Sequence, residues 1–315
     1  MNTESHPLPS RLVIGTRGSK LALWQAHHIR DRLLASGVGE VELLIIKTTG
    51  DRIQDVALSE VGGKGLFVKE IEEALLDGRV DLAVHSMKDM PSALPEGLVL
   101  GAVPERESPL DAWVLPDGRP AGADFLAEVP EGALIGTSSL RRVAQLRAAR
   151  PDLRFIALRG NVDTRLRKLD EREGGLFAIV LACAGLNRLG LGHRISAPIP
   201  AHLMVPAVGQ GALAIEVRAE DPSTHAAIAT LEHDPTRLAT TAERALLAAL
   251  EGNCQVPIGA HATLSDGSLR LVGFFGDELG HTAVAEHTGL ASEASSIGLA
   301  LASTLKARLS APATA

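Results

Sequence analysis

Along the first 183 residues, short apolar runs alternate with segments whose apolar residues recur at helical spacing. The short runs predict strands at residues 12–15, 41–48, 80–85, 98–103, 134–135, 153–158 and 177–183. The amphipathic segments predict helices at residues 20–35, 66–76, 137–149 and 161–172. On the first helix, the residues assigned to a common side are Leu21, Trp24, His28 and Leu33. Strands that alternate with helices favour parallel sheets covered on both faces.

The pattern changes in two places. Residues 105–130 are rich in Pro, Gly and Asp and predict an irregular segment, either a hinge or a peripheral hairpin. After Thr224, two helices precede two strands and a final helix, at residues 224–231, 235–250, 258–264, 269–275 and 292–309. Asp266-Gly267 predicts a hairpin turn between the two strands. This last part is expected to form a separate α+β domain.

Composition excludes several classes of protein. Only 3% of the 315 residues are aromatic and none is Tyr, which disfavours base stacking on single-stranded nucleic acid. The longest apolar run has nine residues, 176–184, and a membrane-spanning helix needs about 20. The N-terminus has no signal-peptide pattern. Two cysteines, Cys183 and Cys254, make neither a disulfide framework nor a metal site, so we expect a cytoplasmic protein without a metal.

Positive charge is concentrated in one window of an acidic chain. The net charge is −7, yet residues 137–172 contain ten Lys/Arg against four Asp/Glu. This contrast indicates a local anion site, and a solvated helix face is the alternative.

Two turns inside the window have the same design. Gly136-Thr-Ser-Ser-Leu-Arg-Arg142 joins a predicted strand to a helix, so backbone N–H groups, hydroxyls and two guanidiniums meet at a helix N-terminus. A simple N-cap by Thr137 or Ser138 is the alternative. Arg159-Gly-Asn-Val-Asp-Thr-Arg165 repeats the design after the next strand.

Two further turns carry cations outside the window. Gly15-Thr-Arg-Gly-Ser-Lys20 lies at a strand-to-helix junction, and Val61-Gly-Gly-Lys-Gly65 presents Lys64 before a helix. Neither a Walker A loop nor a dinucleotide fingerprint is present. Four cationic turns suit a ligand with several carboxylates.

Two residues are candidates for the chemistry itself. Asp89 follows a predicted strand within His85-Ser-Met-Lys-Asp89; it is either part of a turn with Lys88 or the acid that stabilises positive charge and transfers protons. Cys254 lies in a polar turn and is a candidate nucleophile, although no His is near it in sequence. Cys183 lies in an apolar strand and is expected to be inert.

These segments together resemble the porphobilinogen deaminase family. The motifs that carry the resemblance occur in order: Thr16-Arg-Gly-Ser19, Val61-Gly-Gly-Lys-Gly-Leu-Phe67, His85-Ser-Met-Lys-Asp89, Gly136-Thr-Ser-Ser-Leu-Arg-Arg142, Leu158-Arg-Gly-Asn161, Ala207-Val-Gly-Gln-Gly211 and Cys254-Gln-Val-Pro-Ile-Gly259. The resemblance implies two type II periplasmic-binding-protein-like α/β domains, at 1–104 with 205–230 and at 105–204. It also implies a smaller α+β domain at 231–315.

The resemblance further implies a transferase with hydroxymethylbilane synthase activity. Such an enzyme condenses four porphobilinogen units head-to-tail, with loss of ammonia, onto a dipyrromethane attached to Cys254 by a thioether. Asp89 would be catalytic. Cofactor-binding residues would be Cys254, Lys88, Asp89, Ser138, Ser139, Arg141, Arg142, Arg159 and Arg165. Substrate-binding residues would be Arg17, Ser19, Lys64, Arg159, Arg165 and Arg188.

Two other classes of function compete with this one. A solute-binding module for a polycarboxylate would share the domain architecture, and the missing secretion signal argues against it. A nucleic-acid binder would use the basic window, and the acidic net charge argues against it. We expect porphobilinogen as the partner, a monomer, and no nucleic acid or membrane.

Overall fold

The computed structural model describes residues 8–52, 68–250, 256–277 and 280–310. The chain forms two compact units. The first comprises residues 1–106 and 212–237, and the second comprises residues 107–211 and 238–315.

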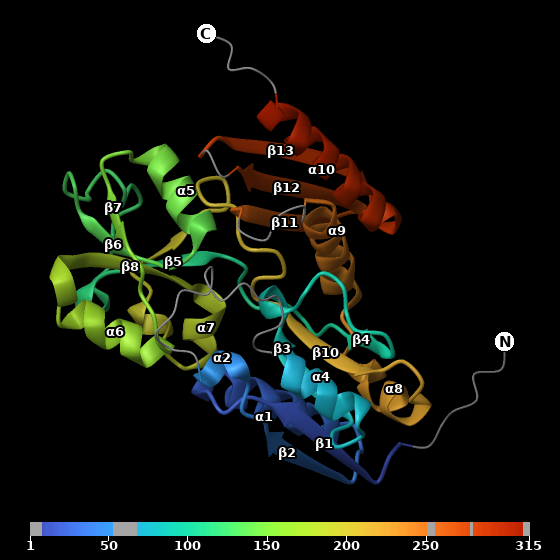
Figure 1. The fold of residues 1–315 in the computed structure, drawn as a ribbon. Helices are drawn as coiled ribbons and strands as arrows, with labels where there is room; N and C mark the ends of the chain where they lie inside the picture. Colours follow the sequence, from blue (N-terminus) through green and yellow to red (C-terminus); the bar gives the residue numbers. More distant parts are fainter. Residues whose placement is uncertain (1–7, 53–67, 251–255, 278–279, 311–315) are drawn as a thin grey trace. The chain divides into compact units, whose positions relative to one another are not determined.

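The first unit contains a five-stranded mixed sheet (Figure 1). Its strands, in spatial order, are β2 (Glu40–Ile45), β1 (Arg11–Thr16), β3 (Leu82–Ser86), β10 (Leu213–Arg218) and β4 (Leu98–Ala102). β2, β1 and β3 are parallel, whereas β10 is antiparallel to both of its neighbours. The expected parallel arrangement thus holds for three of the five strands, because the chain returns after more than 100 residues to insert β10 between β3 and β4.

Helices cover both faces of this sheet, as predicted. The helices and 3₁₀ turns of this unit are α1 (Lys20–Ala35), α2 (Thr49–Arg52), α4 (Lys69–Leu76), η1 (Met87–Asp89), α8 (Pro222–Ile228) and η5 (Ala229–Leu231). Because side chains alternate along a strand, α1 packs on the face that carries Leu12 and Ile14, and α4 packs on the face that carries Val13.

The second unit repeats this strand pattern. Its larger sheet has the order β7 (Arg154–Ile156), β6 (Leu134–Gly136), β8 (Leu176–Ala182), β5 (Asp111–Val114) and β9 (Ala197–Ile199). Here β5 is the antiparallel strand. α5 (Leu140–Ala149) covers one face, while α6 (Val162–Asp170) and α7 (Cys183–Arg188) cover the other. Short 3₁₀ turns are η2 (Pro116–Gly118), η3 (Glu173–Gly175) and η4 (Gly192–Arg194).

The position of β5 corrects one prediction. Residues 105–130 were expected to be irregular, yet Asp111–Val114 forms an interior strand whose side chains are at most 1% exposed. The apolar run, residues 112–115, is only four residues long and lies among Pro and Gly, so its strand signal is weak.

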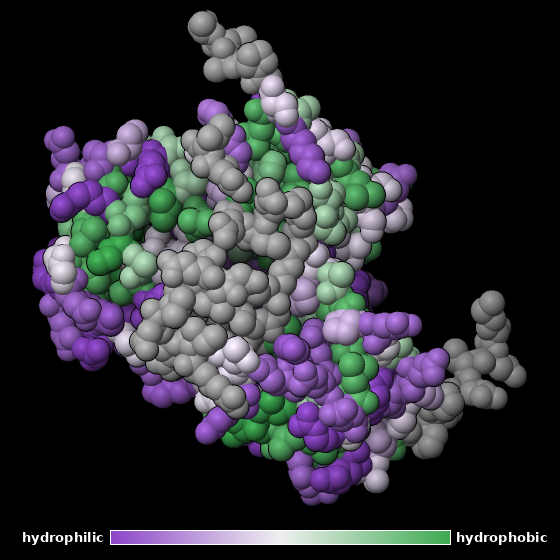
Figure 2. Space-filling view, in the orientation of Figure 1, coloured by the Kyte–Doolittle hydropathy of each residue, from purple (hydrophilic) through white to green (hydrophobic). Residues whose placement is uncertain are grey.

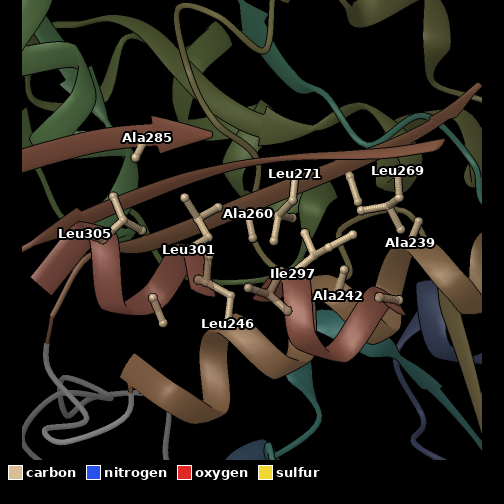
Figure 3. Close-up of a cluster of buried hydrophobic side chains, with 14 of the residues drawn as sticks. Ala239, Ala242, Leu246, Ala260, Leu269, Leu271, Ala285, Ile297, Leu301 and Leu305 are labelled. Atoms are coloured by element: carbon tan, nitrogen blue, oxygen red, sulfur yellow. The ribbon is translucent and has the colours of Figure 1, made fainter. Parts of the chain in front are cut away.

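A three-stranded antiparallel sheet completes the second unit. It consists of β11 (Ile258–Ser265), β12 (Ser268–Gly276) and β13 (Thr282–Leu290), with α9 (Asp234–Leu250), η6 (Ala291–Glu293) and α10 (Ala294–Ser310). Figure 3 shows Leu246 of α9 and Leu301 of α10 pointing toward the sheet. The predicted hairpin turn is confirmed, with positive φ at Asp266 and Gly267.

The predicted fold class is thus confirmed as two α/β sheets and a smaller α+β part. The three domain boundaries stay a prediction. On the face drawn in Figure 2, hydrophilic and apolar residues are interspersed over both units. In the described ranges, every helix is too short or too polar to cross a bilayer.

Candidate functional site

A cavity of about 70 Å³ opens at the carboxyl ends of β1 and β3 in the first unit. This space holds several water molecules or a group the size of a carboxylate. The polar residues that line it are Arg17, Ser19, Gln25, His85, Ser86 and Asp89. The structure therefore brings Arg17 and Ser19 of one predicted segment together with Asp89 of another.

Local structure fixes these side chains. Ser19 is the N-cap of α1, and its hydroxyl accepts a hydrogen bond from the Ala22 amide at 3.3 Å. Gln25 Nε2 donates to Ser86 Oγ at 2.8 Å. The η1 turn buries Met87 and leaves Asp89 exposed at the cavity. A carboxylate that a ligand can reach therefore lines the same cavity as a guanidinium.

A second polar edge lies where β6 and β7 end in the second unit. Ser139 and Asn161 are the N-caps of α5 and α6, and neither side chain makes a capping hydrogen bond. Backbone N–H groups in the first turns of both helices therefore lack a side-chain cap and favour an anion. Ser138 Oγ donates to the Leu158 carbonyl at 2.9 Å, so Ser138 is not the cap of α5. Arg165 Nε donates to the Gly160 carbonyl at 2.8 Å, which places its guanidinium beside the start of α6.

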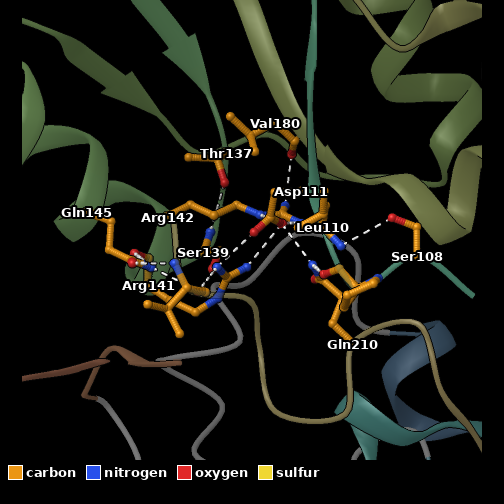
Figure 4. A network of polar contacts seen from close by, with 12 residues as sticks. Ser108, Leu110, Asp111, Thr137, Ser139, Arg141, Arg142, Gln145, Val180 and Gln210 are labelled. Atoms are coloured by element: carbon orange, nitrogen blue, oxygen red, sulfur yellow. Dashed lines mark hydrogen bonds and ion pairs between the residues drawn. The ribbon is translucent and has the colours of Figure 1, made fainter. Parts of the chain in front are cut away.

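Arg141 and Arg142 share one buried carboxylate, Asp111 (Figure 4). Arg141 Nη1 donates to Asp111 Oδ2 at 2.8 Å, and Arg142 Nε donates to Asp111 Oδ1 at 2.9 Å. Arg141 Nη1 also donates to the Val205 carbonyl at 2.7 Å, and Arg142 Nη1 donates to the Val180 carbonyl at 2.8 Å. Burial alone would raise the pKa of Asp111, but the two guanidiniums outweigh it and hold this pKa well below its usual range. Two guanidiniums on one carboxylate leave one net positive charge buried beneath the α5 N-terminus.

Arg188 is buried as well. Its Nη2 donates to the Gly211 carbonyl at 2.6 Å, and burial lowers its pKa to about 10. Arg141, Arg142 and Arg188 thus have protein partners, and direct contact of these three residues with a ligand stays a prediction.

Sequence comparison identifies what kind of protein carries this arrangement. Residues 12–226 match the family model described as "Porphobilinogen deaminase, dipyromethane cofactor binding domain", and residues 237–307 match "Porphobilinogen deaminase, C-terminal domain". The chain belongs to the porphobilinogen deaminase family. A porphobilinogen deaminase of Nitratidesulfovibrio vulgaris strain Miyazaki F is 57% identical over 272 residues, which cover 86% of this chain and 84% of that protein. One from Syntrophotalea carbinolica is 51% identical over 301 residues, covering 95% and 93% of the two chains.

Solved structures are similar only at a distance. The periplasmic aliphatic sulphonate binding protein of Escherichia coli aligns with a TM-score of 0.40 and 14% identity, covering 77% of this chain and 71% of that one. A TRAP periplasmic solute binding protein from Desulfovibrio salexigens aligns with a TM-score of 0.41 and 9% identity, covering 70% and 72%. Neither likeness bears on ligand or activity.

Family membership confirms three predictions: the family itself, a transferase function in tetrapyrrole biosynthesis, and a dipyrromethane cofactor. Of the other predicted site residues of this porphobilinogen deaminase family member, Lys88 is exposed in η1 and Arg159 is half-buried before α6. Cys254 and Lys64 lie outside the described residues. Cys183 is buried, as predicted, and burial raises the pKa of its thiol to about 11, so the thiol stays protonated at neutral pH.

Sequence reasoning missed several polar residues around both edges. His85 and Ser86 belong to a motif that was recognised, yet neither was given a role. Gln25 is buried on the inner face of α1, where a polar residue is uncommon and could have signalled a site. Asp111 and Glu216 had no local signal, because each lies in a strand that the pattern did not predict.

Proposed function

We propose that the chain condenses four porphobilinogen units head-to-tail, with loss of ammonia, and releases hydroxymethylbilane. The dipyrromethane on which this occurs is attached to Cys254 by a thioether. One observation carries the proposal: a cavity at a sheet edge combines the accessible carboxylate of Asp89 with Arg17 and Ser19. Family membership supports the same reaction.

The donors in the structure fit a cofactor with several carboxylate arms. At the edge formed by β6 and β7, the cofactor would be held by Ser138, Ser139, Arg159 and Arg165, with the first turns of α5 and α6. Lys88 and Asp89 would also be cofactor-binding residues. When bound, the dipyrromethane supplies the anchored end to which substrate units are joined.

Arg141 and Arg142 would contribute through their charge. Asp111 neutralises only one of the two guanidiniums, so their cluster favours an anion at the start of α5. Burial lowers the pKa of Arg142, which indicates that its charge is poorly solvated and gains from an added anion. We also propose that Arg141 and Arg142 contact a cofactor carboxylate directly.

Each porphobilinogen carries an acetate and a propionate, so elongation adds two negative charges per unit. These groups would be held by Arg17, Ser19, Lys64, Arg159, Arg165 and Arg188. Arg pairs with a carboxylate through two parallel hydrogen bonds, which orients the ring as well as binding it.

Asp89 would act on the positive charge that develops when ammonia leaves the substrate. A carboxylate beside the aminomethyl carbon stabilises that cation electrostatically, and its Oδ atoms can accept the proton released on condensation. Both roles need an ionised, accessible carboxylate, and Asp89 is exposed at the cavity.

Intact-protein mass spectrometry tests the proposal. The purified, denatured chain should carry the added mass of two pyrrole units, and Cys254→Ser should lack it and make no hydroxymethylbilane. Cys183→Ala is the matched control and should keep the added mass. An active chain of unmodified mass contradicts the attachment, and binding of porphobilinogen without turnover favours a solute-binding module.

The proposal includes a cytoplasmic monomer. Cys183 is a free thiol in the described part of the chain, which fits a reducing compartment. Light scattering of the purified chain and fractionation of cells test these two points.

A further inference from the structure

A buried contact between a histidine and a glutamate lies at the Asp89 cavity and has no place in the proposed mechanism so far. His85 of β3 lines the cavity, and its Nε2 atom lies 3.0 Å from Oε2 of Glu216. The side chains of His85 and Glu216 are 4% and 0% exposed. Strand pairing produces this contact, because β10 runs antiparallel beside β3 and sets Ala214 opposite His85, two residues before Glu216.

A third titratable group adjoins this pair. Glu72 of α4 is buried; burial, followed by the charge of Glu216, raises its pKa. One oxygen of Glu72 and one of Glu216 have no hydrogen-bond partner among the described residues. A buried carboxylate oxygen without a donor is costly, and a bound proton removes that cost.

The composition of this cluster determines what it can do. Two carboxyl groups and one imidazole leave a net charge in the interior when all three are ionised, and a proton held by one of the carboxyl groups removes that charge. The charged groups that face His85 are Glu216 from β10, Glu72 from α4, Asp89 after β3 and Arg17 after β1. Of these, Asp89 and Arg17 share the cavity with the ring of His85.

We propose that the His85–Glu216 pair is a proton relay that returns Asp89 to its ionised form after each condensation. This inference rests on the proposed function. In each condensation, a C–N bond and a C–H bond break while a C–C bond and an N–H bond form. The proton of the C–H bond passes to Asp89, then to the imidazole of His85 with Glu216 as its counter-ion, and finally leaves with ammonia as ammonium.

His85 and Glu216 therefore act as positioning residues, and their variants should change turnover more than binding. His85→Asn and Glu216→Gln should lower kcat about 10-fold or more, while the KM for porphobilinogen stays within about twofold. The dependence of kcat on pH should change shape in both variants. In His85→Gly, added imidazole should restore part of the lost kcat.

A second histidine–carboxylate pair serves as the control for effects on kcat that any histidine substitution would cause. His281 and Asp277 form an exposed contact of 2.8 Å in the three-stranded-sheet part of the second unit. His281→Asn should leave kcat and its pH profile unchanged, and imidazole should not affect His281→Gly.

A second readout does not depend on turnover. In protein with ¹⁵N-labelled histidine, the Nε2–H proton of His85 should give a resonance protected from solvent exchange. It should disappear in His85→Asn and shift in the isosteric Glu216→Gln, which keeps an acceptor oxygen but removes the charge. A wild-type resonance in fast exchange would overturn the inference.

The outcomes also distinguish the relay from the proposed function. If the wild-type chain turns over and His85→Asn matches its kcat and pH profile, the relay is wrong and the proposed function stands. If the wild-type chain makes no hydroxymethylbilane, the proposed function fails, and the relay fails with it whatever the resonance shows.

Discussion

Asp111 and Arg141 are 30 residues apart in sequence, yet their side chains meet in the interior with Oδ2 of Asp111 2.8 Å from Nη1 of Arg141. Asp111 begins β5, and Arg141 lies in the first turn of α5. Gln210 Nε2 also donates to Asp111, at 3.2 Å. The Asp111 carboxylate thus links β5 to α5 and, through Gln210, to residues 205–211. It therefore helps to fix the start of α5, where Ser138 and Ser139 lie.

Replacing Asp111 should therefore destabilise the second unit strongly. Asp111→Asn leaves two buried guanidiniums without a counter-charge, a situation that costs about 3–5 kcal/mol. Asp152→Asn is the matched control, because Asp152 pairs with Arg150 where both are partly exposed, and it should cost about 1 kcal/mol or less. Denaturant unfolding measures both. Equal losses would show that the buried pair contributes no more than the surface pair.

The same residue predicts a dependence of stability on pH. Because the folded-state pKa of Asp111 lies below that of the unfolded chain, its ionisation stabilises the fold at neutral pH. This contribution declines as the pH falls below about 4, near the unfolded value, toward the folded pKa. The difference in unfolding free energy between the wild type and Asp111→Asn should shrink between pH 7 and pH 3. A difference that stays constant over this range would assign the loss to packing instead.

The parts of the fold that local pattern determines were predicted well. Lys20–Ala35 is a helix over its predicted bounds, because Ser19 caps its start and the helix ends before Gly37. Of the residues assigned to a common side, Leu33 is buried, whereas Trp24 stacks on His28 with both side chains exposed. The rest of the buried face is formed by Ala22, Gln25, Ala26 and Ile29.

Long-range pairing limited the prediction of the site. Cationic turns at strand ends could be recognised because each is local in sequence. Glu216 meets His85 only through the pairing of two strands that are 131 residues apart. Asp111 likewise became visible only when β5 was placed beside β8. The sequence therefore predicted the exposed residues of the candidate site, which lie in turns at strand ends. It did not predict buried residues such as Asp111 and Glu216.

Asp89→Asn should abolish turnover while leaving the fold and the bound cofactor in place. Asparagine keeps the size of the side chain but neither stabilises a cation nor accepts a proton, so kcat should fall about 100-fold or more. Asp124→Asn, an exposed position in the second unit, should have no effect. Stopped assays for hydroxymethylbilane, with intact mass as the check on cofactor content, measure this. Turnover near the wild-type value would remove Asp89 from the mechanism.

Arg159 and Arg165 should matter for binding more than for the fold. Arg159→Gln or Arg165→Gln should raise the KM for porphobilinogen about 10-fold or lower the fraction of chains carrying the cofactor, since each removes a charged hydrogen bond to a carboxylate. Arg167→Gln on the same helix is the control, because Arg167 pairs with Glu171 at the surface. If all three variants behave alike, the edge at α6 holds no carboxylate.

Gly211 should not tolerate a side chain, because neighbouring backbone atoms lie too close as well as because its φ is positive. Its φ is +89°, and a Cβ there would lie 2.3 Å from the Glu107 carbonyl oxygen and 2.8 Å from that of Ser108. Gly132 isolates the conformational part, because its φ is +67° and a Cβ would meet nothing within 4 Å. Gly132→Ala should cost about 1–2 kcal/mol from the left-handed backbone. Gly211→Ala adds an overlap with backbone atoms and should cost about 3 kcal/mol or more. Denaturant unfolding of both variants decides the point: equal losses would mean that the close approach of 107–108 to Gly211 relaxes without cost.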